Sequence, residues 1–213
     1  MFGNLPPVTR GLILANVAMF LIEIVANHAG APNPVVAYLG LWPVGTPSIY
    51  GGPGFQPWQI VTYGFLHDPN NLMHILFNMF AVFMFGGPLE RLFGPKRYLN
   101  LYLASIITAG LAQLAYAAIT AAPPYETIGA SGGVFGLLLA FAMYFPRQRV
   151  ILLIFPVPIP AWLFVTLYGL AELFLGVSGM EVNVAHFAHL GGMVGAWLMI
   201  QYWRGRPPFR RRH

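Results

Sequence analysis

Four polar side chains interrupt the apolar stretches of this sequence, and their types suit the chemistry of acyl transfer. His74 and Asn78 are four residues apart, which puts both on one face of a helix, one turn from each other. Ser131 opens one apolar stretch and His189 opens another. A serine hydroxyl is a weak nucleophile until a base takes its proton, and imidazole suits that role. These types predict Ser131 as nucleophile and a histidine as its base.

The same set contains groups that could stabilise negative charge. A tetrahedral intermediate needs hydrogen-bond donors for its oxyanion, and His74, the Asn78 amide and the Ser131 backbone amide could supply them. The chain's only Asp is Asp68, in a loop before the second apolar stretch, so nothing obvious orients the histidine as in a Ser-His-Asp triad. The sequence therefore favours a Ser–His dyad.

Spacing alone leaves two candidates for the base, because His186 and His189 are three residues apart. We favour His189, since Gly191 and Gly192 follow it directly and small residues let membrane helices approach closely. The Ser131 stretch has matching glycines, so its backbone could come near enough for Ser131 to contact His189. These glycines are Gly129, Gly132, Gly133 and Gly136.

The composition is that of an integral membrane protein. Hydrophobic residues make up 57% of the 213 residues and charged residues 8%, against about 25% charged in soluble domains. No linker or low-complexity tract divides the chain, which predicts one membrane domain over residues 1–213. The first apolar stretch has the character of a retained span rather than a signal peptide. The chain has a net charge of +5, and its basic residues lie near the ends of the apolar stretches, where lipid headgroups are their expected partner. No nucleic-acid-binding motif accompanies them, so we expect no nucleic-acid partner.

Six apolar stretches have lengths near the roughly 20 residues that a bilayer requires. Basic residues occur before the first stretch, in every second connection between stretches, and after the last stretch. This alternation is expected when those segments are cytoplasmic, because cytoplasmic loops carry an excess of Lys and Arg. The sequence thus predicts an all-α bundle of six transmembrane helices with both termini cytoplasmic. The expected spans are Gly11–Asn27, Leu72–Leu89, Tyr98–Thr120, Ala130–Phe145, Ala161–Val177 and His189–Trp203.

The candidate residues also share one depth. Counted at about 1.5 Å per residue down to the next cytoplasmic basic residue, Ser131, His74 and His189 stand about 24, 25 and 22 Å above it. In a hydrocarbon core about 30 Å thick, that level lies several ångströms below the external surface, within reach of external water. The long first connection, 28–71, is rich in aromatic residues such as Trp42, Tyr50 and Tyr63, and we expect it to lie in the outer interface.

The chain resembles the rhomboid intramembrane serine proteases over nearly all six spans. Three motifs carry this resemblance in combination. They are His74-x-x-x-Asn78, Gly129-x-Ser131-Gly132, and His189 within Ala188-His189-Leu190-Gly191-Gly192. The chain departs from many members in having Trp58-Gln59 where they carry Trp-Arg.

The resemblance implies Ser131 as nucleophile, His189 as general base, and His74 with Asn78 as oxyanion-hole side chains. Gly129 would shape its loop, Gly132 belongs to the serine motif, and Phe135 would pack on the catalytic histidine. The implied activity is cleavage of transmembrane segments of other membrane proteins, with no metal or organic cofactor. We expect a prokaryotic plasma membrane, an active site open to the external side, and lateral substrate access past the fifth span and its loop 176–184.

Other interpretations stay open. His186 and His189 with His74 or His67 could form a three-histidine metal site, although a nearby carboxylate base is missing from the sequence pattern. A rhomboid-like protein without activity could bind membrane clients instead. Glu23 and Glu172, deep in apolar stretches, could relay protons or be paired structural carboxyls.

Overall fold

The fold is almost entirely helical. The computed structural model describes residues 5–27, 33–48, 52–120, 125–151, 157–179, 185–206 and 208. Two three-residue strands, β1 (Arg149–Ile151) and β2 (Pro158–Pro160), pair antiparallel. The helices are α1 (Pro7–Ala26), α2 (Pro34–Leu39), α3 (Gln59–Thr62), the 3₁₀ segment η3 (Tyr63–Phe65), α4 (Leu72–Ala81), the π-helical segment η4 (Val82–Gly86), α5 (Gly87–Phe93), α6 (Pro95–Thr120), α7 (Ser131–Tyr144), α8 (Ala161–Ser178) and α9 (His186–Arg204).

Among the described residues, four helical stretches are long and apolar enough to cross a bilayer: α1, the continuous stretch 72–93, α6 and α8. The molecule is thus an integral, multi-pass membrane protein. The apolar helix α7 has only 14 residues, which gives a length of about 21 Å against a hydrocarbon core of about 30 Å. Because α7 is short, its first residue can lie below the membrane surface.

Several helices begin about one turn before the predicted spans, as α1 does at Pro7 and α6 at Pro95, and two local features also differ from the prediction. The last helix begins at His186, one turn before the predicted His189. The second span contains the π-helical segment η4, and Pro88 provides a reason, because proline lacks the N–H that would bond to the carbonyl of Met84. The β1–β2 pair was not predicted. The segment 152–156 between the strands lies outside the described residues.

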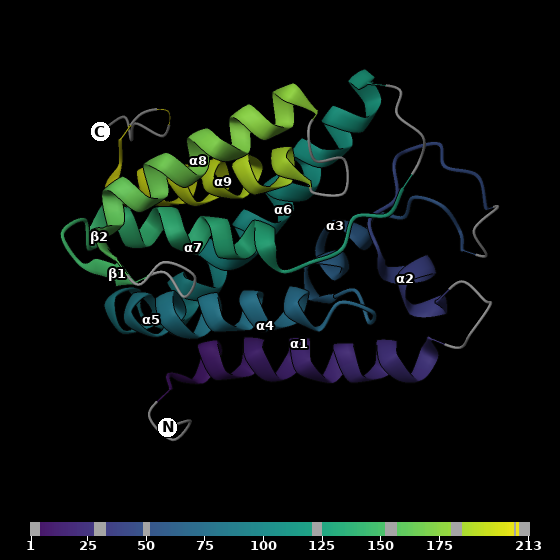
Figure 1. The fold of residues 1–213 in the computed structure, drawn as a ribbon, viewed down its shortest axis with the longest axis horizontal. Helices are drawn as coiled ribbons and strands as arrows, with labels where there is room; N and C mark the ends of the chain where they lie inside the picture. Colours follow the sequence, from purple (N-terminus) through teal and green to yellow (C-terminus); the bar gives the residue numbers. More distant parts are fainter. Residues whose placement is uncertain are drawn as a thin grey trace.

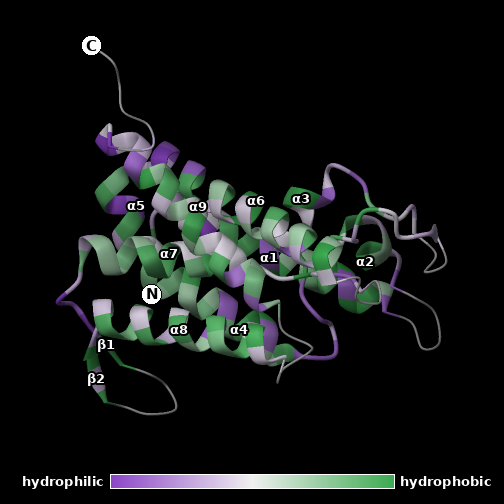
Figure 2. Cartoon of the chain, turned by 90° about the horizontal axis from the view of Figure 1, so that it is seen from above, coloured by the Kyte–Doolittle hydropathy of each residue, from purple (hydrophilic) through white to green (hydrophobic). Residues whose placement is uncertain are grey.

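Helix α7 occupies the middle of the bundle, between α4 and α5 on one side and α8 and α9 on the other (Figure 1). Ten of its 14 residues are buried, including Val134, Leu137 and Phe141. Hydrophobic residues run along the surrounding helices (Figure 2). Many large apolar side chains of α1, α4 and α8 are exposed, as expected of surfaces that face lipid. The tightly packed centre of the protein is therefore the helix that carries Ser131.

Close backbone contact joins α7 to α9. A Cβ placed on Gly192 of α9 would overlap the backbone of Gly132 on α7, so only glycine fits at this crossing. Close approach through small residues is the usual way in which membrane helices gain packing contacts. The glycines therefore set the distance between the helix that carries Ser131 and the helix that carries His189.

Within the described part of the chain, the segments that carry basic residues gather at one end of the bundle. The start of α1, the α5–α6 junction, the β1–β2 pair and the last turn of α9 all lie at the left of Figure 1. Glu90 of α5 accepts hydrogen bonds from the backbone amides of Val8 and Thr9 at 2.9 and 2.7 Å. Its buried carboxylate thus satisfies amides that the start of α1 leaves unpaired.

The connection between α1 and α4 packs more deeply than an interfacial loop. Trp42 and Tyr63 are buried, which corrects the expectation that these aromatics lie in the outer interface, whereas Trp58 is half exposed. Their polar atoms are satisfied within the protein: Trp42 Nε1 donates to the Ala37 carbonyl and the Tyr63 hydroxyl donates to that of Ile106. Tyr50 lies outside the described residues.

Gly192→Ala should loosen the α7–α9 contact. We expect a loss of about 1–3 kcal/mol, seen as a Tm lower by roughly 5 °C in a detergent thermal melt, because the added methyl overlaps the Gly132 backbone. Gly11→Ala on α1 is the control, since a Cβ there meets open space. Equal melting of the two variants would show that the close approach does not stabilise the bundle.

Candidate active site

A cavity of about 1720 Å³ brings the predicted site residues together. His74, Asn78, Ser131 and His189 all line it. The cavity continues along α4, the adjoining segment η4 and α8, with Phe80, Met84, Phe164 and Tyr168 among its lining residues. Groups able to react therefore face a space that also extends between two helices with lipid-exposed surfaces.

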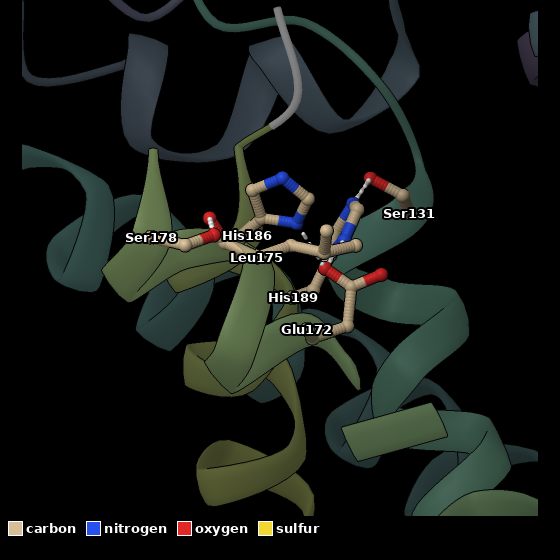
Figure 3. Close-up of polar contacts among 6 residues, drawn as sticks. All are labelled: Ser131, Glu172, Leu175, Ser178, His186 and His189. Carbon is tan, nitrogen blue, oxygen red and sulfur yellow. Dashed lines mark hydrogen bonds and ion pairs between the residues drawn. The ribbon is translucent and has the colours of Figure 1, made fainter. Parts of the chain in front are cut away.

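Ser131 and His189 are in hydrogen-bonding contact. The distance between Ser131 Oγ and His189 Nε2 is 2.9 Å, and the two side chains point toward one another (Figure 3). Ser131 is the first residue of α7, and His189 lies in the first turn of α9. Both therefore come from helix ends that meet at the crossing of Gly132 with Gly192. Where His189 Nε2 carries no proton, it can accept the serine's.

Phe135 holds the ring of His189 from one face. The two rings stack with their centroids 4.2 Å apart and their planes 8° apart. Phe135 lies one turn after Ser131 on α7, so a single helix supplies both the serine and the surface on which the imidazole rests. Tyr168 of α8 contacts the Phe135 ring in turn, with centroids 4.8 Å apart.

His74 faces Ser131 across Gly129. A Cβ built on Gly129 would lie 2.8 Å from His74 Nε2 and 3.6 Å from Ser131 Oγ, so both atoms border the space above this glycine. Gly129 has a φ of +131°, which side-chain-bearing residues rarely adopt. The backbone N–H of Asp68 donates to His74 Nδ1 at 3.4 Å, which leaves the proton of a neutral ring on Nε2, facing the cavity.

Two further donors border the same space. The Asn78 amide donates one hydrogen bond to the His74 carbonyl at 2.8 Å, and an amide nitrogen carries a second N–H. The backbone amide of Ser131 is among the first of α7, and the first four amides of a helix have no partner within it. The residues that carry these three types of donor all line the same cavity.

Glu172 of α8 is a residue whose role the sequence left open between a proton relay and a paired structural carboxyl. Its Oε2 atom accepts hydrogen bonds from His186 Nδ1 at 2.7 Å and from His189 Nδ1 at 2.9 Å (Figure 3). The expectation that no acidic residue reaches the histidine is therefore wrong, because α8 packs against α9 at this level. The available signal was a lone carboxyl on an otherwise uncharged apolar helix, which is a functional candidate by default.

The same three residues form the one group in the described part of the chain with the composition and closeness of a metal site. The ligand atoms of Glu172, His186 and His189 lie within 4.8 Å of one another. This set differs from the predicted three-histidine combination, because neither His74 nor His67 belongs to it. His189 offers Nδ1 to this group, while its Nε2 contacts Ser131.

His67 packs behind His74. It is fully buried, and its ring meets the His74 ring edge-on with centroids 5.0 Å apart. Burial, reinforced by the neighbouring His74, lowers the pKa of His67 to about 3, so this imidazole is neutral at physiological pH. Its backbone amide donates to the Glu23 carboxyl at 3.0 Å, which ties the loop to α1. His67 and Glu23 thus support the wall behind His74.

The sequence matches the model of the Rhomboid domain over residues 54–205. It is 33% identical over 138 residues to Rhomboid protein 1, mitochondrial, of Saccharomyces cerevisiae, covering 63% of this chain and 38% of that protein. Identity to Rhomboid protease GluP of Bacillus subtilis is 28% over 140 residues, covering 66% and 25%. Identity to Rhomboid protease GlpG of Haemophilus influenzae is 30% over 140 residues, covering 65% and 66%.

The chain matches only part of the length of these relatives, from a quarter to two-thirds. The matched domain nevertheless includes α4, α6, α7, α8 and α9, and with them both residues of the Ser131–His189 contact. This chain belongs to the rhomboid family.

Proposed function

We propose that this protein is an intramembrane serine endopeptidase that hydrolyses peptide bonds in or near the transmembrane segments of other membrane proteins. The observation that carries the proposal is the 2.9 Å contact between Ser131 Oγ and His189 Nε2, at the wall of a cavity that reaches between two membrane helices. The family and the protease names of GluP and GlpG support it.

In this proposal the reaction begins when Ser131 Oγ attacks the scissile carbonyl carbon while His189 Nε2 takes the serine proton. The resulting imidazolium then gives its proton to the leaving amine, and an acyl-enzyme remains on Ser131. A water molecule then attacks the ester carbonyl carbon while His189 takes one of its protons, and His189 returns this proton to Ser131 Oγ as the ester C–O bond breaks and the carboxyl product leaves. His189 is the base rather than His186 because its Nε2 contacts the serine, and Phe135 keeps its ring in place.

The oxyanion of the tetrahedral intermediate is stabilised by His74 Nε2, the Asn78 amide and the Ser131 backbone amide. These donors are in place before the reaction, and preorganised hydrogen bonds to developing charge contribute strongly to catalysis. Gly129 leaves the space beside His74 and Ser131 open, and Gly192 lets α9 bring His189 close to α7.

We further propose one six-span domain over residues 1–213 with both termini cytoplasmic, in a prokaryotic plasma membrane. The gathering of basic segments at one end of the bundle supports this orientation, because cytoplasmic loops carry the excess of Lys and Arg. Ser131 then faces the external side. It lies below the external membrane surface, because α7 is shorter than the hydrocarbon core is thick.

The proposed substrate is a transmembrane helix that unwinds locally, because its peptide bonds are otherwise held in internal hydrogen bonds. Helix-weakening residues and a small residue before the cleaved bond should favour cleavage. Access is lateral, between α4 and α8, since the cavity continues along both helices. The outer part of the predicted gate, 180–184, lies outside the described residues.

The first test compares wild type, Ser131→Ala and His189→Ala in cleaving a labelled type-I transmembrane substrate in detergent. We expect the wild type to cut and both variants to lose at least about 10³-fold in rate, because each lacks one partner of the proton transfer. If the Ser131→Ala variant still cleaves the substrate and a chelator stops this cleavage, the protein is a metal-dependent hydrolase and the serine protease proposal is wrong.

A wild type that neither cuts nor reacts with a fluorophosphonate at Ser131 would favour a protein that only binds membrane clients. Fluorophosphonate labelling without cleavage would show a competent serine given an unsuitable substrate.

Asn78→Ala should lower kcat while Ser131 keeps its reactivity toward a small fluorophosphonate. One lost oxyanion donor costs about 3–4 kcal/mol at most, so the expected loss is about 10²–10³-fold. Parallel measurements of turnover, probe labelling and thermal melting separate this effect from misfolding. If turnover stays at the wild-type level, Asn78 has only a packing role.

Lateral access can be tested by a crosslink, since the chain has no cysteine. Phe80→Cys on α4 and Phe164→Cys on α8 place thiols along the cavity, and a bifunctional reagent can join them. The joined protein should stop cleaving a transmembrane substrate but still react with a small probe, whereas the unjoined double variant should do both. Undiminished cleavage after complete crosslinking contradicts lateral access between these helices.

A further inference from the structure

Glu172 places a carboxylate where the membrane makes charge costly. It is 4% exposed and is the only acidic or basic residue of α8, a helix whose large apolar side chains Leu170, Phe174 and Val177 are exposed. A carboxyl at such a site needs hydrogen-bond partners inside the protein. Both partners that the structure supplies are imidazoles of α9, and both bond to one oxygen, Oε2.

The bond to His189 determines where that imidazole carries its proton. A neutral imidazole has one N–H, and a carboxylate can only accept, so the 2.9 Å contact with Glu172 places the proton on Nδ1. His189 Nε2 then has a lone pair directed at Ser131 Oγ. This is the form that a general base requires, whereas the other tautomer would present an N–H to the serine.

The local packing brings α8 close enough for this bond. Gly176 lies one turn after Glu172, and a Cβ there would lie 3.1 Å from the Cβ of His186 and 3.2 Å from the ring of Phe187. Because glycine occupies the position, α8 can approach the first turn of α9. The carboxylate and the two imidazoles thereby meet without any intervening side chain.

We infer that Glu172 is a positioning residue that holds His189 in the Nδ1–H tautomer and stabilises its imidazolium, so that the site works as a Ser131–His189–Glu172 triad rather than a dyad. The inference rests on the proposed protease function. His186 is the second donor to the same oxygen and keeps it turned toward α9. Because α7, α8 and α9 each contribute one member, the triad is complete only while α8 packs against α9.

Glu172→Gln is the primary variant. An amide keeps the side chain's size but loses its negative charge, and in a well-studied Ser-His-Asp triad such a change lowers kcat by about 10⁴-fold. We expect kcat to fall by roughly 10²–10⁴-fold with KM little changed, because substrate does not touch Glu172. Glu172→Asp keeps the charge on a shorter side chain and should recover part of the activity.

The pH profile separates positioning from simple packing. The titratable groups around His189 are Glu172 of α8, His186 of α9 and His74 of α4. Loss of the negative charge makes imidazolium less stable, so the acid limb of kcat/KM should move to lower pH in Glu172→Gln and remain in place in Glu172→Asp. The matched control is Glu90→Gln, which removes another buried carboxylate and should lower the Tm without moving the acid limb.

A measurement on the unaltered protein covers the case in which Glu172 variants fail to fold. Nitrogen NMR of protein labelled with ¹⁵N-histidine reports which ring nitrogen of His189 carries the proton, and the signal is assigned by its loss in His189→Ala. We expect the Nδ1–H tautomer near neutral pH. The Nε2–H tautomer would overturn the inference, even if the protein proves to have no protease activity.

Other outcomes are equally decisive. Wild-type kcat and an unmoved acid limb in Glu172→Gln would leave a dyad, with Glu172 only joining two helices. Activity that a chelator abolishes and Zn²⁺ restores would assign the Glu172–His186–His189 group to a metal and overturn the triad. Failure of the protease proposal is recognised separately, by a wild type that neither cleaves nor labels.

Discussion

The contact between α7 and α9 is the constraint on which the site depends. At this crossing Gly192 meets the backbone of Gly132, and no side chain separates the two helices. In lipid, apolar surfaces gain little from association itself, so close backbone packing has to supply the attraction between helices. That packing places His189 at 2.9 Å from Ser131, and a helix separation larger by one methyl group would break the contact.

Water is scarce around these helices, and the buried carboxyl groups show how the chain adapts to that. Glu90 satisfies the amides at the start of α1, Glu23 accepts from the backbone of His67, and Glu172 accepts from two histidines. Each carboxyl joins segments that are distant in sequence or belong to different helices. Two of these contacts organise the ends of the bundle, and the third bears directly on the histidine that contacts Ser131.

The length of α7 relates the packing to the chemistry. A helix of 14 residues is shorter than the hydrocarbon core is thick, and the chain leads into it through the non-helical segment 125–130, so that the helix begins at Ser131. The serine therefore lies at a helix N-terminus, where the first amides have no partner within the helix. The cavity provides the space that a peptide segment needs to reach it, and its continuation along α4 and α8 gives that space a lateral side.

The helical stretches could be predicted from sequence because lipid requires nearly continuous apolar segments of defined length and excludes charge from their middles. Counting residues along each apolar stretch predicts one common level for His74, Ser131 and His189, and in the structure all three line one cavity. The spacing of His186 and His189 alone did not decide which of them is the base for Ser131. The packing of the helices brings His189 Nε2 to Ser131.

The contact of Glu172 with His189, the burial of Trp42 and Tyr63, and the β1–β2 pair were decided by tertiary structure. Sequence patterns give the height of a residue along a helix but not the rotation of that helix or its neighbours, which depend on many weak contacts summed over the whole bundle. The types of the site residues and their positions along each helix are thus written in the sequence, whereas the partner of each residue is set by how the helices pack.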